Sequence, residues 1–307
     1  MGCLVVVVGP TGIGKSSLGI YMAKRFQGEI INSDSRQIYR YMDIGTAKPS
    51  IEERAIIPHH LIDIINPDEN FSLAQFQELA FKAIDEILQR GKLPLLVGGS
   101  GLYVRAVVEG WETPKVPPDI EFRKYLEQRA ETGETLAIYE ELKKQDPDAA
   151  RNIDPRNVRR VIRALEVIRI ARVPFSSLQK KKLPPFQTMI IGLTADRDEL
   201  YRRTDRRVDD MIERGLIEEV KNLFMMGYSL HLPSMSSIGY RQVGDYLEGK
   251  INLESAIYQI KTETHRFIRH QYNWFRLADP RIKWLNIQEN AIEERVVEEV
   301  GRFINNL

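Results

Sequence analysis

Residues 9–16 carry the most specific chemical signal in the sequence. They read GPTGIGKS and fill the pattern G-x-x-x-x-G-K-[ST] directly after the apolar run LVVVV. In this pattern, backbone N–H groups at a helix start surround phosphate oxygens, while the lysine adds a positive charge and the serine can bind Mg²⁺. We therefore predict that a phosphorylated substrate is bound by Gly9, Pro10, Thr11, Gly12, Ile13, Gly14, Lys15 and Ser16, with Mg²⁺ at Ser16.

The segments around this loop alternate between strand and helix patterns. Four apolar segments read as buried strands of one sheet: residues 4–8, 29–33, 93–97 and 188–194. Helices are expected at 15–26 and at 72–90, where Ser72 and Gln75 have the form of a capping box. This alternation predicts an α/β fold with a doubly wound parallel sheet, as in P-loop NTPases.

Asp34 and Ser100 each follow a predicted strand, at the edge of the sheet where such folds bind ligands. We therefore expect Gly14, Asp34 and Ser100 to lie at one site. Asp34 could accept a proton from a nucleophile, or it could be an ordinary turn or helix-capping residue. The strand at 93–97 ends in Gly-Gly-Ser rather than in an aspartate, which makes an ordinary ATPase less favoured.

Two proline-rich segments, 113–118 and 182–185, enclose a stretch with helical periodicity. We interpret 116–186 as a helical insertion domain in a P-loop core formed by 1–115 and 187–307. Residues 151–207 carry 15 Lys/Arg against 6 Asp/Glu, although the net charge of the chain is only +1. Such a local excess favours a polyanionic partner, although a solvated face without a partner would look the same.

Bulk properties exclude several classes of protein. The longest apolar run is far shorter than the roughly 18 residues that a membrane span requires. Cys3 is the only cysteine, so no internal disulfide can form. We expect a monomeric protein of the reducing cytoplasm, without a membrane partner.

The segment NSDSRQIYRYMDIGTAKP, residues 32–49, resembles the signature of the tRNA dimethylallyltransferases (IPP transferase family). Further matches in the same order include GGSGLY at 98–103, RRVIRALE at 159–166, IGYRQ at 238–242 and RHQYNWFR at 269–276. Ser100 stands where the family usually has threonine, and His270 where it has Arg or Lys. The resemblance implies transfer of a dimethylallyl group from dimethylallyl diphosphate to N6 of the adenosine 3′ to the anticodon, in tRNAs reading codons that begin with U.

The resemblance also implies that the insertion, 116–186, binds tRNA, and that 1–115 and 187–307 form the catalytic core with a C-terminal helical part that contacts RNA. It implies roles for individual residues as well. Lys15, Arg207 and Mg²⁺ would stabilise the leaving diphosphate, Asp34 would accept the N6 proton, and Ser100 would orient the base. The anticodon stem-loop of tRNA would be contacted by Asp34, Ser35, Arg36, Gln37, Ser100, Arg123, Arg159, Arg160, Val161, Ile162, Arg163, Gly239, Tyr240, Arg241, Arg269, Gln271, Trp274 and Arg276.

Some of these assignments have open alternatives. The arginines of 156–163 follow one helical stripe that can face phosphates, whereas the aromatic residues at 272–275 could equally well pack in the core. Prenyl transfer to free AMP or ADP is the second interpretation of the whole chain, although a free nucleotide requires no basic insertion. A small-molecule P-loop kinase and a non-enzymatic RNA-binding module are further alternatives.

Overall fold

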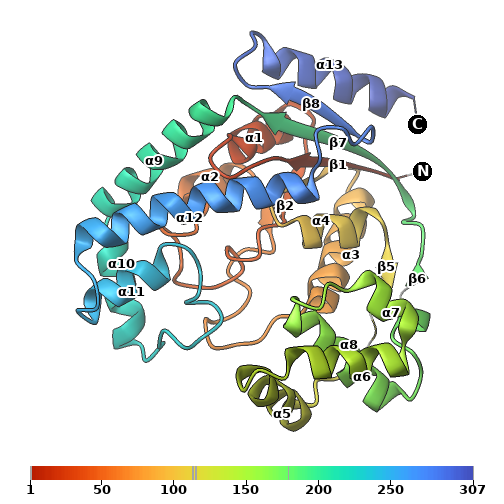
Figure 1. Cartoon of the computed structure of the whole chain (residues 1–307). Helices are drawn as coiled ribbons and strands as arrows, with labels where there is room; N and C mark the ends of the chain where they lie inside the picture. The colour runs from red at the N-terminus through yellow and green to blue at the C-terminus, as the bar shows by residue number, and fades with distance from the viewer. Residues whose placement is uncertain (1, 113, 115, 179, 307) are drawn as a thin grey trace. The chain divides into compact units, whose positions relative to one another are not determined.

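The computed structural model describes residues 2–112, 114, 116–178 and 180–306. The chain forms two compact units (Figure 1). Unit 1 comprises Met1–Val108 and Pro184–Leu307, and unit 2 comprises Glu109–Leu183. No helix among the described residues is both long and apolar enough to cross a membrane.

Unit 1 is built on a six-stranded sheet in the order β3-β2-β4-β1-β7-β8, in which every pair of neighbours is parallel. The strands are β1 (Gly2–Val8), β2 (Glu29–Asn32), β3 (His59–His60), β4 (Pro94–Val97), β7 (Phe186–Thr194) and β8 (Ile282–Asn286). β1 is central, and its continuous run of buried valines pairs with β4 on one side and β7 on the other. The predicted α/β fold with a doubly wound parallel sheet is confirmed.

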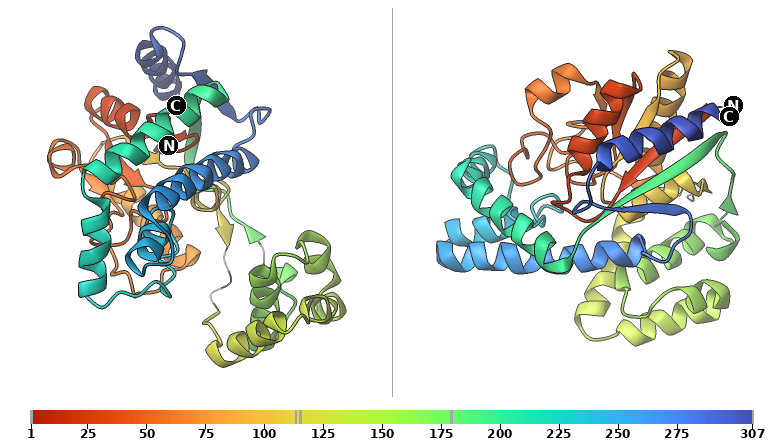
Figure 2. Two further views of the ribbon diagram at one scale, coloured as in Figure 1. Left: turned by 60° about the vertical axis from the view of Figure 1, so that its left-hand side comes forward. Right: turned by 90° about the horizontal axis from the view of Figure 1, so that it is seen from above.

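Helices cover both faces of this sheet (Figure 2). On one face, alternate residues of β1 pack with α1 (Lys15–Arg25) and α13 (Ile292–Asn305). On the other face, the intervening residues of β1 pack with α3 (Leu73–Gln89) and α4 (Gly101–Val108). The predicted capping box of α3 is present, because Ser72 Oγ accepts a hydrogen bond from the Gln75 N–H and Gln75 bonds back to Ser72. The two apolar layers hold the strand ends at fixed positions.

A second group of helices in unit 1 packs around the loop that follows β2. It contains α9 (Arg197–Glu213), α10 (Leu216–Met225), α11 (Tyr240–Leu247) and α12 (Leu253–Trp274). Their apolar faces share a core with Ile38 and Met42 of that loop. The short α2 (Ile51–Ile56) follows the loop and begins with a capping box formed by Ser50 and Glu53.

Unit 2 is helical and has a core of its own. Its helices are α5 (Ile120–Glu131), α6 (Thr135–Gln145), α7 (Pro147–Asn152) and α8 (Val158–Ala171), followed by the 3₁₀ turn η1 (Ser176–Leu178). An antiparallel pair, β5 (Trp111–Glu112) with β6 (Lys180–Lys181), joins its first and last residues. The apolar stripe expected in α8 is buried in this core.

Candidate active site

The phosphate loop, residues 9–16, joins the end of β1 to the start of α1. Gly14 is the N-cap of α1 and has a φ of 102°, a left-handed conformation that glycine adopts without strain. No side chain of the described residues caps this helix end, so the first N–H groups of α1 are left for a ligand. Such N–H groups, with the helix dipole behind them, bind phosphate. The local geometry therefore suits an anion.

Lys15 supplies the charge of the phosphate loop and is half-buried. Its Nζ donates a hydrogen bond to the Pro10 carbonyl at 2.7 Å, which folds the side chain over the loop. Burial lowers the pKa of Lys15 to about 7, with Asp34 opposing the change and Arg207 adding to it. An anionic ligand would therefore restore the charge of this ammonium at neutral pH.

The phosphate loop opens into a pocket of about 1120 Å³, lined entirely by residues of unit 1. Gly14, Asp34 and Ser100 all line this pocket, so the predicted convergence of three strand ends is confirmed. Other predicted site residues that line it are Thr11, Gly12, Lys15, Ser16, Ser35, Arg36, Gln37, Arg207, Gly239, Gln271 and Trp274. Its volume lies slightly above the range for small-molecule sites, roughly 300–1,000 Å³, and leaves room for a second ligand beside a phosphate group.

Backbone hydrogen bonds hold Asp34 and Ser100 at neighbouring strand ends. Oδ1 of Asp34 accepts a hydrogen bond from the Arg36 N–H at 2.8 Å, so Asp34 does make the turn contact of the alternative interpretation. Ser100 Oγ accepts one from the Ser35 N–H at 3.0 Å. The second carboxylate oxygen of Asp34 has no hydrogen-bond partner among the described residues. That oxygen is available to a ligand.

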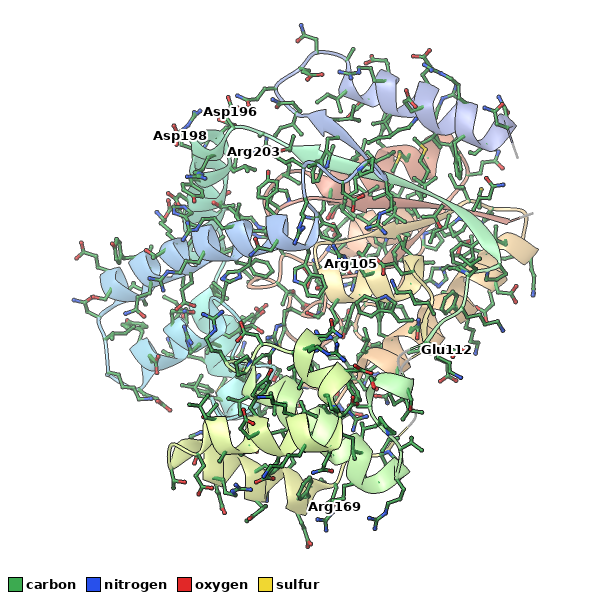
Figure 3. The ribbon with its side chains drawn as sticks, turned by 45° about the vertical axis from the view of Figure 1, so that its right-hand side comes forward. Arg105, Glu112, Arg169, Asp196, Asp198 and Arg203 are labelled. Carbon is green, nitrogen blue, oxygen red and sulfur yellow. The ribbon has the colours of Figure 1, made fainter. Side chains whose placement is uncertain are left out.

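Helix α9 adds a row of cations to the pocket wall. Arg203, Arg206 and Arg207 of this helix and its C-cap residue Arg214 all line the pocket; Arg203 is labelled in Figure 3. Burial lowers the pKa of Arg207, the charge of Asp34 opposes this, and Arg214 adds to it. None of the four forms an ion pair with a carboxylate of the described residues. A row of unpaired cations attracts a polyanion.

The signature segment after Asp34 folds into a loop that is held by a buried lysine. The Lys48 side chain is only 2% exposed, and its Nζ donates to the Tyr39 carbonyl at 2.6 Å. The same ammonium lies 2.6 Å from Asp43 and 2.5 Å from Asp63. A buried charge requires such partners, so this cluster fixes the loop backbone.

Gln37 and Arg36, which are predicted to bind tRNA, also take part in holding this loop. Gln37 Nε2 donates to the carbonyls of Thr46 and Ala47, each at 3.1 Å. Arg36 Nη1 donates to the Pro233 carbonyl at 3.0 Å. Both side chains still line the pocket, so their protein contacts orient them toward a ligand.

Tyr240 can offer only its backbone to RNA, because its side chain is fully buried. Its hydroxyl donates to Glu219 on α10 at 2.5 Å. The Glu219 carboxylate also accepts three successive backbone N–H groups of the signature loop, those of Asp43, Ile44 and Gly45. Tyr240 therefore supports the carboxylate that anchors this loop.

The predicted residues of α12 and its neighbours differ in their environments. Trp274 lines the pocket, and the Arg105 guanidinium of α4 lies 5.5 Å from its ring centre. Arg269 donates to the Tyr201 hydroxyl at 2.8 Å. Gln271 is buried and bonded at both ends of its amide. The remaining two lie outside the pocket lining: Arg276 is exposed, and Arg241 is ion-paired with Glu263.

Unit 2 carries the other predicted RNA contacts, and only some of them are free. Arg159 and Arg160 are exposed, with no ion-pair partner among the described residues. Arg123 and Arg163 both pair with the fully buried Glu166, at 2.9 and 2.5 Å. The side chains of Val161 and Ile162 are in the core, so these two positions can offer only their backbone to RNA.

Sequence reasoning missed the residues that hold the loops in place. Glu219 was not predicted, because nothing in a glutamate on an amphipathic helix signals contacts with a distant backbone. Arg214, a pocket residue, was also missed. It could have been predicted, since it follows Arg203 and Arg207 on one helical face, at positions i, i+4 and i+11.

Comparisons with known proteins show which family this chain resembles over most of its length. The family model described as IPP transferase matches residues 37–278. The tRNA dimethylallyltransferase of Dehalococcoides mccartyi is 49% identical over 301 residues, which cover 98% of this chain and 92% of the relative. That of Chloroflexus aggregans is 51% identical over 276 residues, covering 90% and 93%.

Solved structures of similar fold are also transferases of this kind. The full-length tRNA isopentenylpyrophosphate transferase of Bacillus halodurans superposes with a TM-score of 0.72 at 42% identity, covering 100% of this chain and 96% of the other. A eukaryotic dimethylallyltransferase, described as acting on tRNA, gives a TM-score of 0.84 at 31% identity, covering 100% and 80%. With the phosphate loop, the signature segment and the strand-end pocket all present in the structure, this chain belongs to the IPP transferase family.

Proposed function

We propose that this protein is a tRNA dimethylallyltransferase. It transfers the dimethylallyl group of dimethylallyl diphosphate to N6 of the adenosine 3′ to the anticodon, in tRNAs reading codons that begin with U, and releases diphosphate. The observation that carries this proposal is the single pocket in which the phosphate loop meets Asp34 and Ser100. The names of the relatives, which describe the same activity, support it.

The diphosphate is the leaving group, so its negative charge grows as the allylic C–O bond breaks. The N–H groups of the phosphate loop face it from one side, and Lys15 and Arg207 add positive charge from within the same pocket. Fixed donors and cations in a partly buried site stabilise such charge without reorganising. They therefore act on the transition state more than on the bound substrate.

The acceptor N6 is a poor nucleophile, because its lone pair is delocalised into the adenine ring. As the new C–N bond forms, N6 must lose a proton. The free carboxylate oxygen of Asp34 can accept this proton. The Ser100 hydroxyl accepts from the Ser35 N–H and donates to Ser35 Oγ at 3.3 Å, a long bond that it can exchange for one to the base. An adenine in the anticodon loop must leave its stack to enter the pocket, which costs a few kcal/mol.

Magnesium fits the loop as a partner of the diphosphate. No group of three or more His, Cys, Asp or Glu within the described residues could hold a metal ion. Mg²⁺ at phosphate sites usually takes one or two protein oxygens and completes its shell with water and phosphate oxygens. The Ser16 hydroxyl, at the first turn of α1 and in the pocket lining, would supply such an oxygen. Bound there, the ion would neutralise part of the diphosphate charge.

A substrate-choice assay tests the proposal against the two other enzymatic interpretations. The protein is incubated with labelled dimethylallyl diphosphate and Mg²⁺, together with tRNA, AMP or ADP. A parallel reaction contains ATP and small acceptors. We expect label only in tRNA, at the adenosine 3′ to the anticodon. Label in free nucleotide would support the adenylate isopentenyltransferase, and phosphate transfer from ATP the kinase.

A further inference from the structure

Gln271 on α12 connects the two glycine-rich loops of the pocket. Its side chain is 4% exposed. Oε1 accepts a hydrogen bond from the Thr11 N–H of the phosphate loop at 2.8 Å, and Nε2 donates one to the Gly99 carbonyl at 3.1 Å. A peptide N–H only donates and a carbonyl only accepts, so the orientation of the amide is fixed by its partners. One buried side chain thus links two loops that are far apart in the sequence.

The contact with residues 98–101 is so close that a side chain at position 99 would displace the Gln271 amide. A Cβ atom on Gly99 would lie 2.3 Å from Nε2 of Gln271. The next residue, Ser100, donates its N–H to the Ser33 carbonyl at 3.2 Å. Its Oγ accepts the N–H of Ser35, next to Asp34. The link from Gln271 therefore reaches the strand end that carries Asp34.

We propose that Gln271 is a positioning residue that sets the separation between the two substrates. This inference rests on the proposed function. The diphosphate of the donor contacts residues 9–16, whereas the adenine contacts Asp34 and Ser100. The reacting carbon and N6 must approach to about 3–3.5 Å in the right direction, and a misplacement of about 1 Å can lower the rate on the order of 10²-fold. Gln271 contacts both the loop that binds the donor and the loop that binds the adenine.

A tRNA contact by Gln271, as the family resemblance implies, is the competing interpretation. Burial argues against it, and both ends of the amide already have partners within the protein. The two roles differ in what they change. Loss of an RNA contact raises the Kd for tRNA, whereas loss of positioning lowers the rate at saturation and leaves the Kd values in place.

Gln271→Met tests the inference, because methionine has a similar length and removes both hydrogen bonds. The single-turnover rate is measured by rapid quench with saturating dimethylallyl diphosphate and anticodon stem-loop RNA. We expect the rate to fall about 10–100-fold. The Kd values for donor and RNA should stay close to those of the wild type. Gly99→Ala should reproduce the fall, since the added Cβ displaces the Gln271 amide while Gln271 itself is retained.

Gln77→Met is the matched control. Gln77 is also a buried glutamine of unit 1, and its Nε2 donates to the Ala106 carbonyl at 2.6 Å, outside the pocket lining. Its loss removes a buried hydrogen bond of the same kind without touching either glycine-rich loop. We expect a lower melting temperature and an unchanged single-turnover rate.

Each outcome decides the question. A wild-type rate in Gln271→Met and Gly99→Ala overturns the inference, and so does a slower reaction that saturating RNA restores. If Gln271→Met does not fold, Gly99→Ala alone decides on the same criteria. A wild-type protein that transfers no label to tRNA would overturn the proposed function instead, so the two failures are distinguishable.

Discussion

At the scale of single residues, Asp34 uses its two carboxylate oxygens differently. Oδ1 is committed to the Arg36 N–H, and the other oxygen is free. Asp34→Asn keeps the turn contact through the amide oxygen but cannot accept a proton. We expect the single-turnover rate at saturating tRNA and donor to fall by ~10²–10⁴, the usual effect of losing a general base. Donor affinity should hardly change, because the phosphate loop binds the diphosphate.

A rate within a few-fold of wild type would make Asp34 a residue that only positions the base. The proton would then pass to water or to the leaving diphosphate. Equilibrium binding of tRNA by the same variant is the control, since one lost hydrogen bond to a charged group costs ~1.5–3 kcal/mol at most.

The lowered pKa of Lys15 predicts that donor binding depends on pH. Its pKa in the free protein is lowered to about 7 by burial. A bound diphosphate places negative charge beside Nζ and raises that pKa, so binding takes up a proton above pH 7. Affinity for the donor should therefore weaken as the pH rises through this pKa, from roughly 6.5 to roughly 8.5. Titrations at a series of pH values measure the Kd directly.

Lys15→Arg is the control for the ionisation of the diphosphate itself, because arginine stays charged over this range. The ratio of the wild-type Kd to the Kd of Lys15→Arg should rise with pH. A constant ratio would show that Lys15 keeps its proton throughout.

At the scale of elements, Glu166 on α8 organises the start of unit 2. Its buried carboxylate accepts from Arg123, Arg163 and the N–H of Asp119, which caps α5. Glu166→Gln removes the charge and one of these acceptors. We expect the free energy of unfolding to fall by ~1–3 kcal/mol, as for other buried groups that lose a partner. Denaturant unfolding followed by circular dichroism measures it.

Glu141→Gln is the control in the same unit, because Glu141 is 41% exposed and pairs with the single arginine Arg129. Because water reaches the Glu141 carboxylate, we expect a loss close to the ~0.2–1 kcal/mol of surface ion pairs. Equal losses in the two variants would contradict a special role for Glu166. Because Arg163 pairs with Glu166, replacing Arg163 would lower the stability of unit 2 as well as weaken RNA binding.

Local patterns in the sequence are sufficient to predict the elements that begin at a motif. The phosphate loop, the capping box of α3 and the apolar stripe of α8 depend on neighbouring residues, and each is present in the structure. Long-range partners leave no such pattern. Gln271 and Tyr240 match the family motif, yet their burial depends on Thr11, Gly99 and Glu219, which only the folded chain brings to them. The edge strand β8, for the same reason, was not predicted.

At the scale of the whole molecule, charge is expected to govern tRNA affinity. Arg159 and Arg160 are the exposed cations of α8 without a described partner. Replacing both with alanine should weaken tRNA binding and reduce the slope of log K against log salt by ~0.7–0.9 for each lost phosphate contact. Binding isotherms at several salt concentrations give the slope. Donor affinity should be unchanged, because the pocket lining belongs to unit 1.

Arg169→Ala on the same helix is the control, since Arg169 pairs with Asp119 and lies over the Phe122 ring. An equal loss of slope in this variant would assign the effect to general charge rather than to Arg159 and Arg160. The monomeric state and the cytoplasmic location expected from the sequence stay predictions that need their own measurements.

The short pair of β5 with β6 has a consequence for chain entropy. Trp111 lies opposite Lys181 in this antiparallel pair, so the two ends of unit 2 are held a few ångströms apart. To unit 1, the folded segment Glu109–Leu183 is therefore equivalent to a tight turn. If it unfolded, the same segment would become a long flexible loop, whose closure costs about 3 kcal/mol more because each doubling of length adds ≈ 0.6 kcal/mol. Folding of unit 2 thus lowers the loop-closure free energy that the sheet of unit 1 must overcome when it folds. The stabilities of the two units are therefore linked through the chain.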